Sequence, residues 1–423
     1  MLNNVMPKSL RFIDLFAGAG GLSEGFIRAG FEPIAHVEAD LSACFTLKTR
    51  QAFHWLNKND KSHIYADYLN NKISRDELYN YVPKIETDSV INKFIDKESL
   101  PQIFQEIDKL VGEQNIDLII GGPPCQAYSL IGRARGNMVN DERNHLYIYY
   151  GEFLKRYSPK YFVFENVLGL LTAKDPSGSL YFDKMKALFV EIGYSIEYKI
   201  LAANEYGVLQ NRKRIILVGK KDHFSEESFY PDPEKWNPKV NVEELFADLP
   251  KIKAGGGTPT PQKYLNYQSE WLQKSGIKGK FPLTWHQARP HSEQDLEIYR
   301  FAVTLWNKEK RRLRYNDLPA RLKSHKETDS FVDRFKVVAA DLPATHTVVA
   351  HISKDGHHYI HPDIEQNRSI TPREAARIQT FPDDYYFENS SGKPARTSAF
   401  KQIGNAVPVL LAQKIAEQLL RNW

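Results

Sequence analysis

Short apolar runs alternate with amphipathic stretches in the first half of the chain. Five runs have the length and composition of buried strands: residues 10–16, 31–37, 116–120, 161–164 and 214–219. Helical periodicity appears between them, for example at residues 22–29, 100–111, 146–155 and 182–192. This alternation predicts an α/β fold built on a doubly wound, mostly parallel sheet with helices on both faces. Ligands of such sheets bind outside the carboxyl ends of the strands.

The pattern changes near residue 223. Residues 224–361 carry proline and glycine punctuation and no repeated strand–helix unit, which predicts a second, smaller and irregular domain after a first domain at 1–223. Helical periodicity returns in residues 362–423, where Thr371 and Glu374 have the spacing of a capping box. The last helix has one apolar face, so we expect this C-terminal segment to fold back onto the first domain.

Charge is uneven along the chain. The 57 lysines and arginines exceed the 52 acidic residues only slightly, for a net charge of +5. Residues 308–326, however, hold eight lysines and arginines against two acids. Such a stripe can neutralise phosphates, although a charge run is also typical of a solvated face.

Cysteine usage and the start of the chain favour a cytoplasmic protein. Cys44 and Cys125 are the two cysteines among 423 residues, so neither a disulfide framework nor a paired-cysteine zinc site is expected. The first ten residues lack a signal-peptide pattern, and no apolar run approaches the roughly 18 residues of a membrane span. A histidine-rich stretch at residues 351–361 lacks thiolate or carboxylate partners at ligand spacing, so we expect no metal site.

A glycine-rich segment, residues 16–21 (FAGAGG), follows the first predicted strand. It contains two of the three glycines of a dinucleotide fingerprint, but Ser23 occupies the third position. Glu38 ends the next strand, where a carboxylate can accept hydrogen bonds from ribose hydroxyls. A tight turn in any α/β protein is the alternative for this segment alone.

A more specific signal follows the third predicted strand, where the chain reads Pro123-Pro124-Cys125-Gln126. Two prolines fix the backbone and would hold the cysteine rigidly at the ligand edge of the sheet. Glu165 closes the next strand at the equivalent edge. A thiolate can add to an electron-poor carbon while a carboxylic acid protonates the ring nitrogen that receives the charge. An inert buried thiol remains the alternative.

Together these segments resemble the DNA (cytosine-5)-methyltransferase family. They stand in that family's order: residues 16–21, Glu38, 121–129 (GGPPCQAYS), 165–167 (ENV), 210–214 (QNRKR), 371–385 (TPREAARIQTFPDDY) and 402–408 (QIGNAVP). The resemblance covers residues 10–219 and 366–423, and it implies the Rossmann-like fold of S-adenosylmethionine-dependent methyltransferases.

The resemblance implies catalytic roles for four residues. Cys125 matches the nucleophile that adds to C6 of a cytosine flipped out of the duplex, which makes C5 a methyl acceptor. Glu165 matches the residue that holds N3 during this addition. Arg212 and Arg214 match arginines near the cytosine O2 and the nucleic-acid backbone.

The implied cofactor is S-adenosylmethionine. Its matched contacts lie at the predicted strand ends and in the final motif: Phe16, Gly18, Gly20, Glu38, Asp67, Pro123, Asn405 and Val407. Phe16 would flank the adenine and Glu38 would hold the ribose. Asp67 would contact the adenine, but an extra polar stretch at residues 57–63 precedes it.

The implied substrate is double-stranded DNA. Residues 224–361, between the arginine motif and the motif at 371–385, would be the target-recognition domain, whose loops do not reveal the DNA sequence that they read. We expect DNA contacts from residues beside the nucleophile and in the basic stripe: Gln126, Ser129, Arg311, Arg312 and Arg314. The length of the chain favours a bacterial modification enzyme of a type II restriction system, with a cognate restriction endonuclease as functional rather than physical partner. The resemblance implies that the enzyme acts as a monomer.

Two alternatives share the same fold. A tRNA cytosine-5 methyltransferase is disfavoured because the insertion at residues 224–361 is long for that branch. A catalytically silent DNA-binding regulator is disfavoured because Cys125, Glu165 and both arginines are present. A nicotinamide oxidoreductase fits neither Ser23 nor Cys125.

Overall fold

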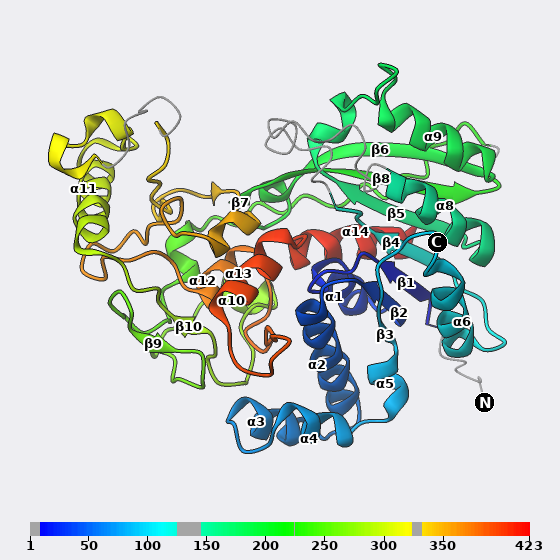
Figure 1. Cartoon of the computed structure of the whole chain (residues 1–423), viewed down its shortest axis with the longest axis horizontal. Coiled ribbons are helices and arrows are strands. Elements are labelled where there is room, and N and C mark those ends of the chain that lie inside the picture. The colour runs from blue at the N-terminus through cyan, green and yellow to red at the C-terminus, as the bar shows by residue number, and fades with distance from the viewer. Residues whose placement is uncertain (1–8, 125–144, 224, 324–331) are drawn as a thin grey trace.

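The computed structural model describes residues 9–124, 145–223, 225–323 and 332–423. Figure 1 shows two lobes, one built around a large sheet and one made mostly of loops and short elements. The C-terminal helices run between the two lobes.

A seven-stranded sheet organises the first lobe, in the order β3-β2-β1-β4-β5-β8-β6. The strands are β1 (Arg11–Leu15), β2 (Glu32–Glu38), β3 (Val90–Asn92), β4 (Leu118–Gly121), β5 (Tyr161–Asn166), β6 (Tyr194–Ala202) and β8 (Lys213–Lys221). Neighbours from β3 to β5 pair in parallel, and β8 runs antiparallel to β5 and β6. The predicted doubly wound, mostly parallel sheet is therefore confirmed, and the carboxyl ends of β1, β2, β4 and β5 share one edge.

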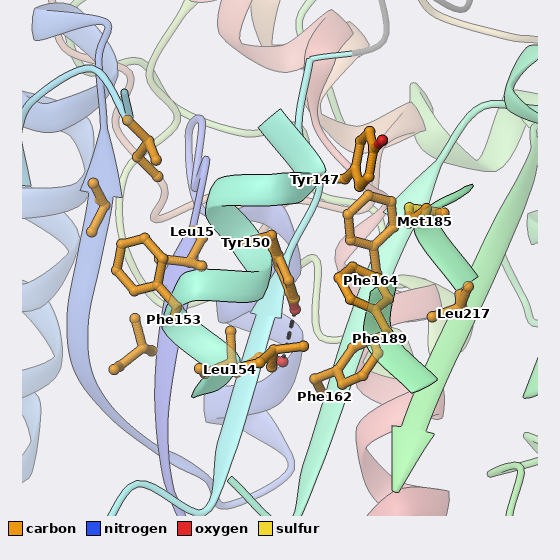
Figure 2. Close-up of a cluster of buried hydrophobic side chains, with 14 of the residues drawn as sticks. Leu15, Tyr147, Tyr150, Phe153, Leu154, Phe162, Phe164, Met185, Phe189 and Leu217 are labelled. Atoms are coloured by element: carbon orange, nitrogen blue, oxygen red, sulfur yellow. Dashed lines mark hydrogen bonds between the residues drawn. The ribbon is translucent and has the colours of Figure 1, made fainter. Parts of the chain in front are cut away.

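Helices cover both faces of this sheet. They are α1 (Gly21–Arg28), α2 (Leu41–Lys58), α6 (Leu100–Val111), α8 (Leu146–Tyr157), α9 (Tyr181–Glu191) and α14 (Val409–Arg421). Residues of α6, α8 and α9 share one apolar core with the sheet, and residues of α1 and α14 share another. Figure 2 shows Tyr150 of α8 inserted among aromatic side chains of the first core. Its hydroxyl lies 3.2 Å from the carbonyl oxygen of Ile119, so the buried phenol has an acceptor.

Three short helices separate α2 from β3, and the hydrophobic pattern did not predict them. They are α3 (Ser62–Leu69), α4 (Arg75–Asn80) and α5 (Lys84–Asp88). Their aromatic residues pack on Phe53 of α2 and on Phe281 of the second lobe. The polar stretch at residues 57–63 covers the end of α2 and the start of α3, and Asp67 lies on α3.

The second lobe is irregular, as its punctuation predicts, except for one long helix that the sequence did not reveal. Its regular elements are α10 (Glu270–Lys274), α11 (Glu293–Glu309) and the paired strands β9 (Gly257–Thr258) and β10 (His286–Gln287). β7 (Gln210–Asn211) pairs with β11 (Thr345–His346) and joins the two lobes. Single turns of 3₁₀ helix complete the described chain: η3 (Leu168–Thr172), η4 (Ala203–Glu205), η5 (Val242–Leu245), η6 (Tyr315–Asp317), η7 (Ala320–Leu322) and η9 (Ala350–Ser353).

The C-terminal segment fastens the lobes together. α12 (Pro372–Ile378) begins at the predicted capping box, where the Glu374 amide donates to Thr371 Oγ1 at 3.2 Å and the Thr371 amide donates to Glu374 Oε2 at 2.7 Å. α12 and α13 (Arg396–Asn405) share a core with the second lobe. α14 packs on α1, where a Cβ on Gly25 would lie 2.4 Å from Ala412. The division at residues 223 and 361 stays a prediction.

Buried charges strengthen the contact between α12 and the second lobe. Arg377 is fully buried and reaches Asp248 at 2.6 Å and Asp383 at 2.7 Å. Because removal of one partner would leave an uncompensated buried charge, such pairs fix the packing of the helix. In the described part of the chain, no helix is long and apolar enough to cross a membrane.

Candidate functional site

A cavity of about 290 Å³ opens at the carboxyl edge of the sheet. The ends of β1, β2, β4 and β5 form its floor, and α13 with the segment after it forms the opposite wall. Six of the eight residues expected to bind the cofactor line this cavity: Phe16, Gly18, Glu38, Pro123, Asn405 and Val407. The final motif therefore meets the first motif in space, although almost the whole chain separates them.

The glycine-rich turn shapes one side of the cavity. Phe16 has a φ of 57°, a left-handed conformation that is rare for an aromatic residue and is typical of functional turns. Gly20 also has a positive φ, 81°, and serves as the N-cap of α1. A Cβ on Gly21 would lie 2.4 Å from the carbonyl oxygen of Val407, so glycine permits this close approach of the two motifs.

Glu38 is fixed at the end of β2 by two backbone donors. The Gly18 amide donates to Oε2 at 2.7 Å, and the Asp40 amide donates to Oε1 at 2.7 Å. Burial raises the pKa of Glu38, although these backbone hydrogen bonds oppose the rise. A carboxylate held in this way keeps lone pairs that can accept from a pair of ribose hydroxyls. The residues of the cavity therefore fit a nucleoside.

Two expected cofactor residues lie elsewhere. Gly20 faces the core, where an added Cβ would lie 2.8 Å from Tyr385 Oη and from Leu47. Asp67 lies on α3, with a side chain 39% exposed and bonded to Lys72. The structure does not place Asp67 among the residues that line the cavity, because it lies on α3, so its contact with the adenine stays a prediction that this geometry does not support.

The segment after β3 supplies cavity residues that the sequence analysis did not predict. Lys93, Phe94 and Ile95 line the cavity. Phe94 is 44% exposed, which leaves an aromatic face available at the cavity wall. The sequence offered little signal for this segment, because β3 is only three residues long.

An ion pair stands at the ends of β5 and β8. Arg214 Nε lies 2.7 Å from Glu165 Oε1, each side chain is 13% exposed, and both residues line the cavity. Gly122 makes room for this carboxylate, because a Cβ there would lie 2.7 Å from Glu165 Oε2. The predicted carboxyl group therefore reaches the same cavity as the cofactor residues.

The proline pair connects this site to the expected nucleophile. Asn166 Nδ2 donates to the carbonyl oxygen of Pro123 at 3.2 Å, which ties the proline segment to β5. Pro123 and Pro124 both line the cavity. Cys125, Gln126 and Ser129 lie outside the described residues.

Arg212 is not in the cavity. Its side chain is 1% exposed, and it donates to the carbonyl oxygens of Val348 at 2.7 Å and Ala406 at 2.8 Å. The side chain therefore connects the junction of β7 and β8 to the second lobe and to the final motif. The expectation that Arg212 contacts the cytosine or the nucleic-acid backbone is corrected accordingly: this guanidinium positions the cavity wall.

The arginines of the basic stripe differ in their surroundings. The three from which DNA contacts are expected, Arg311, Arg312 and Arg314, follow α11 and are exposed. Arg311 contacts Asp317 at 2.5 Å and Glu309 at 3.3 Å, so its charge is already compensated. Within the described ranges, no ion pair engages the side chains of Arg312 and Arg314. Their charges are available to a ligand, whereas the charge of Arg311 is largely satisfied.

The histidine-rich stretch does not form a cluster. Tyr299 Oη lies 2.9 Å from His357 Nδ1, and His346 Nε2 lies 2.5 Å from the carbonyl oxygen of His358. Over residues 9–124, 145–223, 225–323 and 332–423, no group of three or more His, Cys, Asp or Glu residues has a metal-binding arrangement.

Asp14 is a cavity residue that sequence analysis missed. It is the fourth residue of β1, is 1% exposed and lines the cavity. Burial is the main reason that the pKa of Asp14 is raised well above its usual value. A lone acid in an apolar strand was the only available signal.

Comparisons with known proteins agree with this geometry. A sequence profile described as C-5 cytosine-specific DNA methylase matches residues 10–83 and 75–421. The type II methyltransferase M.Bpa9945I of Bacillus paralicheniformis is 40% identical, over 96% of this chain and 97% of its own. The type II methyltransferase M.DdeI of Desulfomicrobium norvegicum is 32% identical, over 98% of this chain and 89% of its own.

A solved structure shows a similar fold. The crystal structure of a putative DNA modification methyltransferase encoded within an E. coli prophage superposes with a TM-score of 0.61. The two sequences are 24% identical, and the match covers 98% of this chain and 99% of the other. Together with the sequence matches, which extend over nearly the whole chain, these findings establish that the protein belongs to the C-5 cytosine-specific DNA methylase family.

Proposed function

We propose that this protein transfers a methyl group from S-adenosylmethionine to C5 of a cytosine in double-stranded DNA. It acts as a monomeric, sequence-specific modification enzyme of a type II restriction system, with a restriction endonuclease as its functional partner. The curated relatives above are named type II methyltransferases. The observation that carries the proposal is the shared cavity, in which the Glu165–Arg214 pair stands beside the nucleoside-binding residues.

The cavity suits S-adenosylmethionine in three respects. Glu38 would accept the ribose hydroxyls, and Phe16 with Phe94 would flank the adenine. Asn405 and Val407 would close the cavity from the side of the C-terminal segment. When bound, the cofactor supplies an electrophilic methyl group carried on a positively charged sulfur.

The protein's part of the chemistry begins with Cys125. Its thiolate forms a bond to C6 of the flipped-out cytosine, and the electron pair of the C5–C6 double bond moves toward the ring nitrogen N3 and the carbonyl O2. C5 is then electron-rich and takes up the methyl group. Loss of the C5 proton to a base and departure of the thiolate restore the double bond.

Glu165 and Arg214 would hold the ring during the addition. A carboxyl group at N3 stabilises the charge that develops there, and a guanidinium at O2 donates hydrogen bonds to the carbonyl. In the described structure these two groups hold each other at 2.7 Å. They are therefore already oriented toward one site, which lowers the cost of assembling it around the base.

The test is bisulfite sequencing of plasmid DNA from a methylation-free host that expresses the chain, beside a host that expresses Cys125→Ser. We expect protected cytosines at one short recurrent sequence, and none with the variant, because serine is a far weaker nucleophile. Cytosines that remain protected in the host expressing Cys125→Ser would refute the assignment of Cys125 as the nucleophile. Absence of protection with the folded wild-type protein would refute the proposed DNA methylation.

A further inference from the structure

Tyr385 joins the segment after α12 to the glycine-rich turn of the cavity, and the function proposed above gives it no role. Its side chain is 1% exposed, and its hydroxyl donates to the carbonyl oxygen of Ala19 at 2.5 Å. Ala19 lines the cavity, and it lies 366 positions before Tyr385 in the chain. Two motifs that the sequence analysis singled out, residues 16–21 and 371–385, therefore meet through this hydroxyl.

The carbonyl oxygen of Ala19 depends on Tyr385 for a donor. Ala19 precedes the N-cap of α1, and the first helical hydrogen bond runs from the Glu24 amide to the Gly20 carbonyl at 2.8 Å. Between described residues, no backbone amide donates to the Ala19 oxygen. A buried carbonyl group that loses its donor is destabilised, so removal of the hydroxyl favours a different orientation of this peptide group.

The turn that contains Ala19 has an unusual backbone. Three of its residues have left-handed conformations, with φ of 57°, 56° and 81°: Phe16, Gly18 and Gly20. Such conformations persist when the surrounding structure holds them. On the cavity side the Gly18 amide donates to Glu38 Oε2 at 2.7 Å, and on the core side Tyr385 holds the Ala19 carbonyl.

The surroundings of Tyr385 fix its position. Arg373 Nη2 donates to the Tyr385 carbonyl oxygen and to Thr284 Oγ1 of the second lobe, each at 2.9 Å. The Arg50 guanidinium lies 4.7 Å from the centre of the Tyr385 ring and pairs with Glu24 of α1 at 2.6 Å. Burial raises the pKa of Tyr385, so the hydroxyl keeps the proton that it donates. The hydroxyl therefore reaches the turn from a rigid frame that includes both lobes.

We propose that Tyr385 is a positioning residue for cofactor binding: its hydroxyl holds the Ala19 carbonyl on the core side and so keeps the glycine-rich turn in the conformation that receives S-adenosylmethionine. This inference rests on the proposed cofactor. Tyr385 does not line the cavity, so it acts by preorganising the turn, which lowers the cost of ordering it on binding. Gly20 gains a function from the same contact, because a Cβ there would lie 2.8 Å from Tyr385 Oη.

Tyr385→Phe tests this proposal, because it removes the hydroxyl and keeps the ring. Calorimetric titration with S-adenosylmethionine should show an affinity that is about fivefold to tenfold lower than that of the wild-type protein, as expected for the loss of one hydrogen bond. In the methyl-transfer assay, the KM for the cofactor should rise by the same factor. The kcat at saturating cofactor should stay within about twofold, because Glu165 and Arg214 are unchanged.

Tyr194→Phe is the matched control. Tyr194 of β6 is 2% exposed, its hydroxyl donates to the Pro159 carbonyl oxygen at 2.8 Å, and it does not line the cavity. This variant should lower the urea midpoint about as much as Tyr385→Phe does, and it should leave the cofactor affinity unchanged. An equal loss of affinity in both variants would overturn the positioning role, because general destabilisation would then explain it.

Hydrogen exchange tests the inference even if Tyr385→Phe does not fold. In the cofactor-free wild-type protein, the amides of residues 16–24 should already be protected, and this protection should decrease in Tyr385→Phe but not in Tyr194→Phe. Unprotected amides in the cofactor-free wild-type protein would refute a preorganised turn. Wild-type affinity in Tyr385→Phe refutes this inference alone, whereas failure of the wild-type protein to bind S-adenosylmethionine refutes the proposed cofactor.

Discussion

Replacing Arg212 with methionine separates a structural from a substrate-binding role for this arginine. The guanidinium donates two buried hydrogen bonds, to the carbonyl oxygens of Val348 and Ala406. Hydrogen bonds from a charged donor contribute about 1.5 to 3 kcal/mol each, so Arg212→Met should lower the free energy of unfolding by about 3 kcal/mol or more. Methionine fills most of the volume of the aliphatic stem, which keeps the cavity term small.

Arg214→Met is the matched comparison. Arg214 makes one short contact with a charged partner, Glu165, in a cavity open to solvent, so its removal should lower the free energy of unfolding by about 1.5 kcal/mol, about half the loss expected for Arg212→Met. Methyl transfer should fall by about a hundredfold, because the reacting ring then lacks a donor. Urea unfolding and a methyl-transfer assay measured on the same preparations give both quantities.

The two variants should therefore show opposite patterns. Arg212→Met should lose stability, and its activity should recover when a stabilising osmolyte restores the folded fraction. If Arg212→Met unfolds at the wild-type urea midpoint but transfers methyl groups much more slowly, the structural role of Arg212 is refuted. The original expectation, that Arg212 contacts the substrate, would then hold.

Three further outcomes follow from the structure. Replacing Arg312 and Arg314 with glutamine should reduce the slope of log affinity for DNA against log salt by about 1 for each phosphate that is no longer neutralised. Arg311→Gln should change this slope less, because the charge of Arg311 is already paired with Asp317. An equal change of slope in all three variants would contradict this distinction. Gly122→Ala should lower methyl transfer with little change in unfolding temperature, because the new Cβ would lie 2.7 Å from Glu165 Oε2 and would displace that carboxylate. Unchanged methyl transfer would show that the position of the Glu165 carboxylate is unimportant. Burial lowers the pKa of His36 to about 3, so this side chain takes up a proton in the unfolded chain before it does in the folded one. The free energy of unfolding should therefore fall by about 1.4 kcal/mol for each pH unit below pH 6.5. Urea unfolding at pH 7 and pH 5 should show a smaller fall in His36→Gln, and an equal fall in the variant and the wild-type protein would contradict the role of His36.

The fold was predictable where local pattern and tertiary environment agree. The helix expected at residues 100–111 has those bounds as α6, and the Thr371–Glu374 capping box is present. β3 is too short to show a pattern, and β6 exposes residues along an edge of the sheet, so neither resembles a buried strand in the sequence. α11 was missed because polar residues interrupt its apolar positions.

The site was predictable where a motif fixes both chemistry and position. Glu38 and Glu165 reach the cavity because each closes a strand of the same sheet. Asp67 does not line the cavity, because three short helices follow α2 and the order of residues in the chain does not reveal where those helices lie. Arg212 and Arg214 are two residues apart, yet one is buried against carbonyl groups and the other pairs with Glu165.

The sequence by itself determined the class of fold, the order of the motifs and the chemical groups available for catalysis, because these depend on local periodicity and residue identity. Only the tertiary structure decided which groups share a cavity, which charges are paired and which buried atom lacks a partner. Burial and electrostatic environment arise from residues distant in the chain, as when Asn405 lines the same cavity as Phe16 or when the charge of Glu38 raises the pKa of Asp14. For this reason Asp14 is recognisable as a cavity residue only in the folded chain.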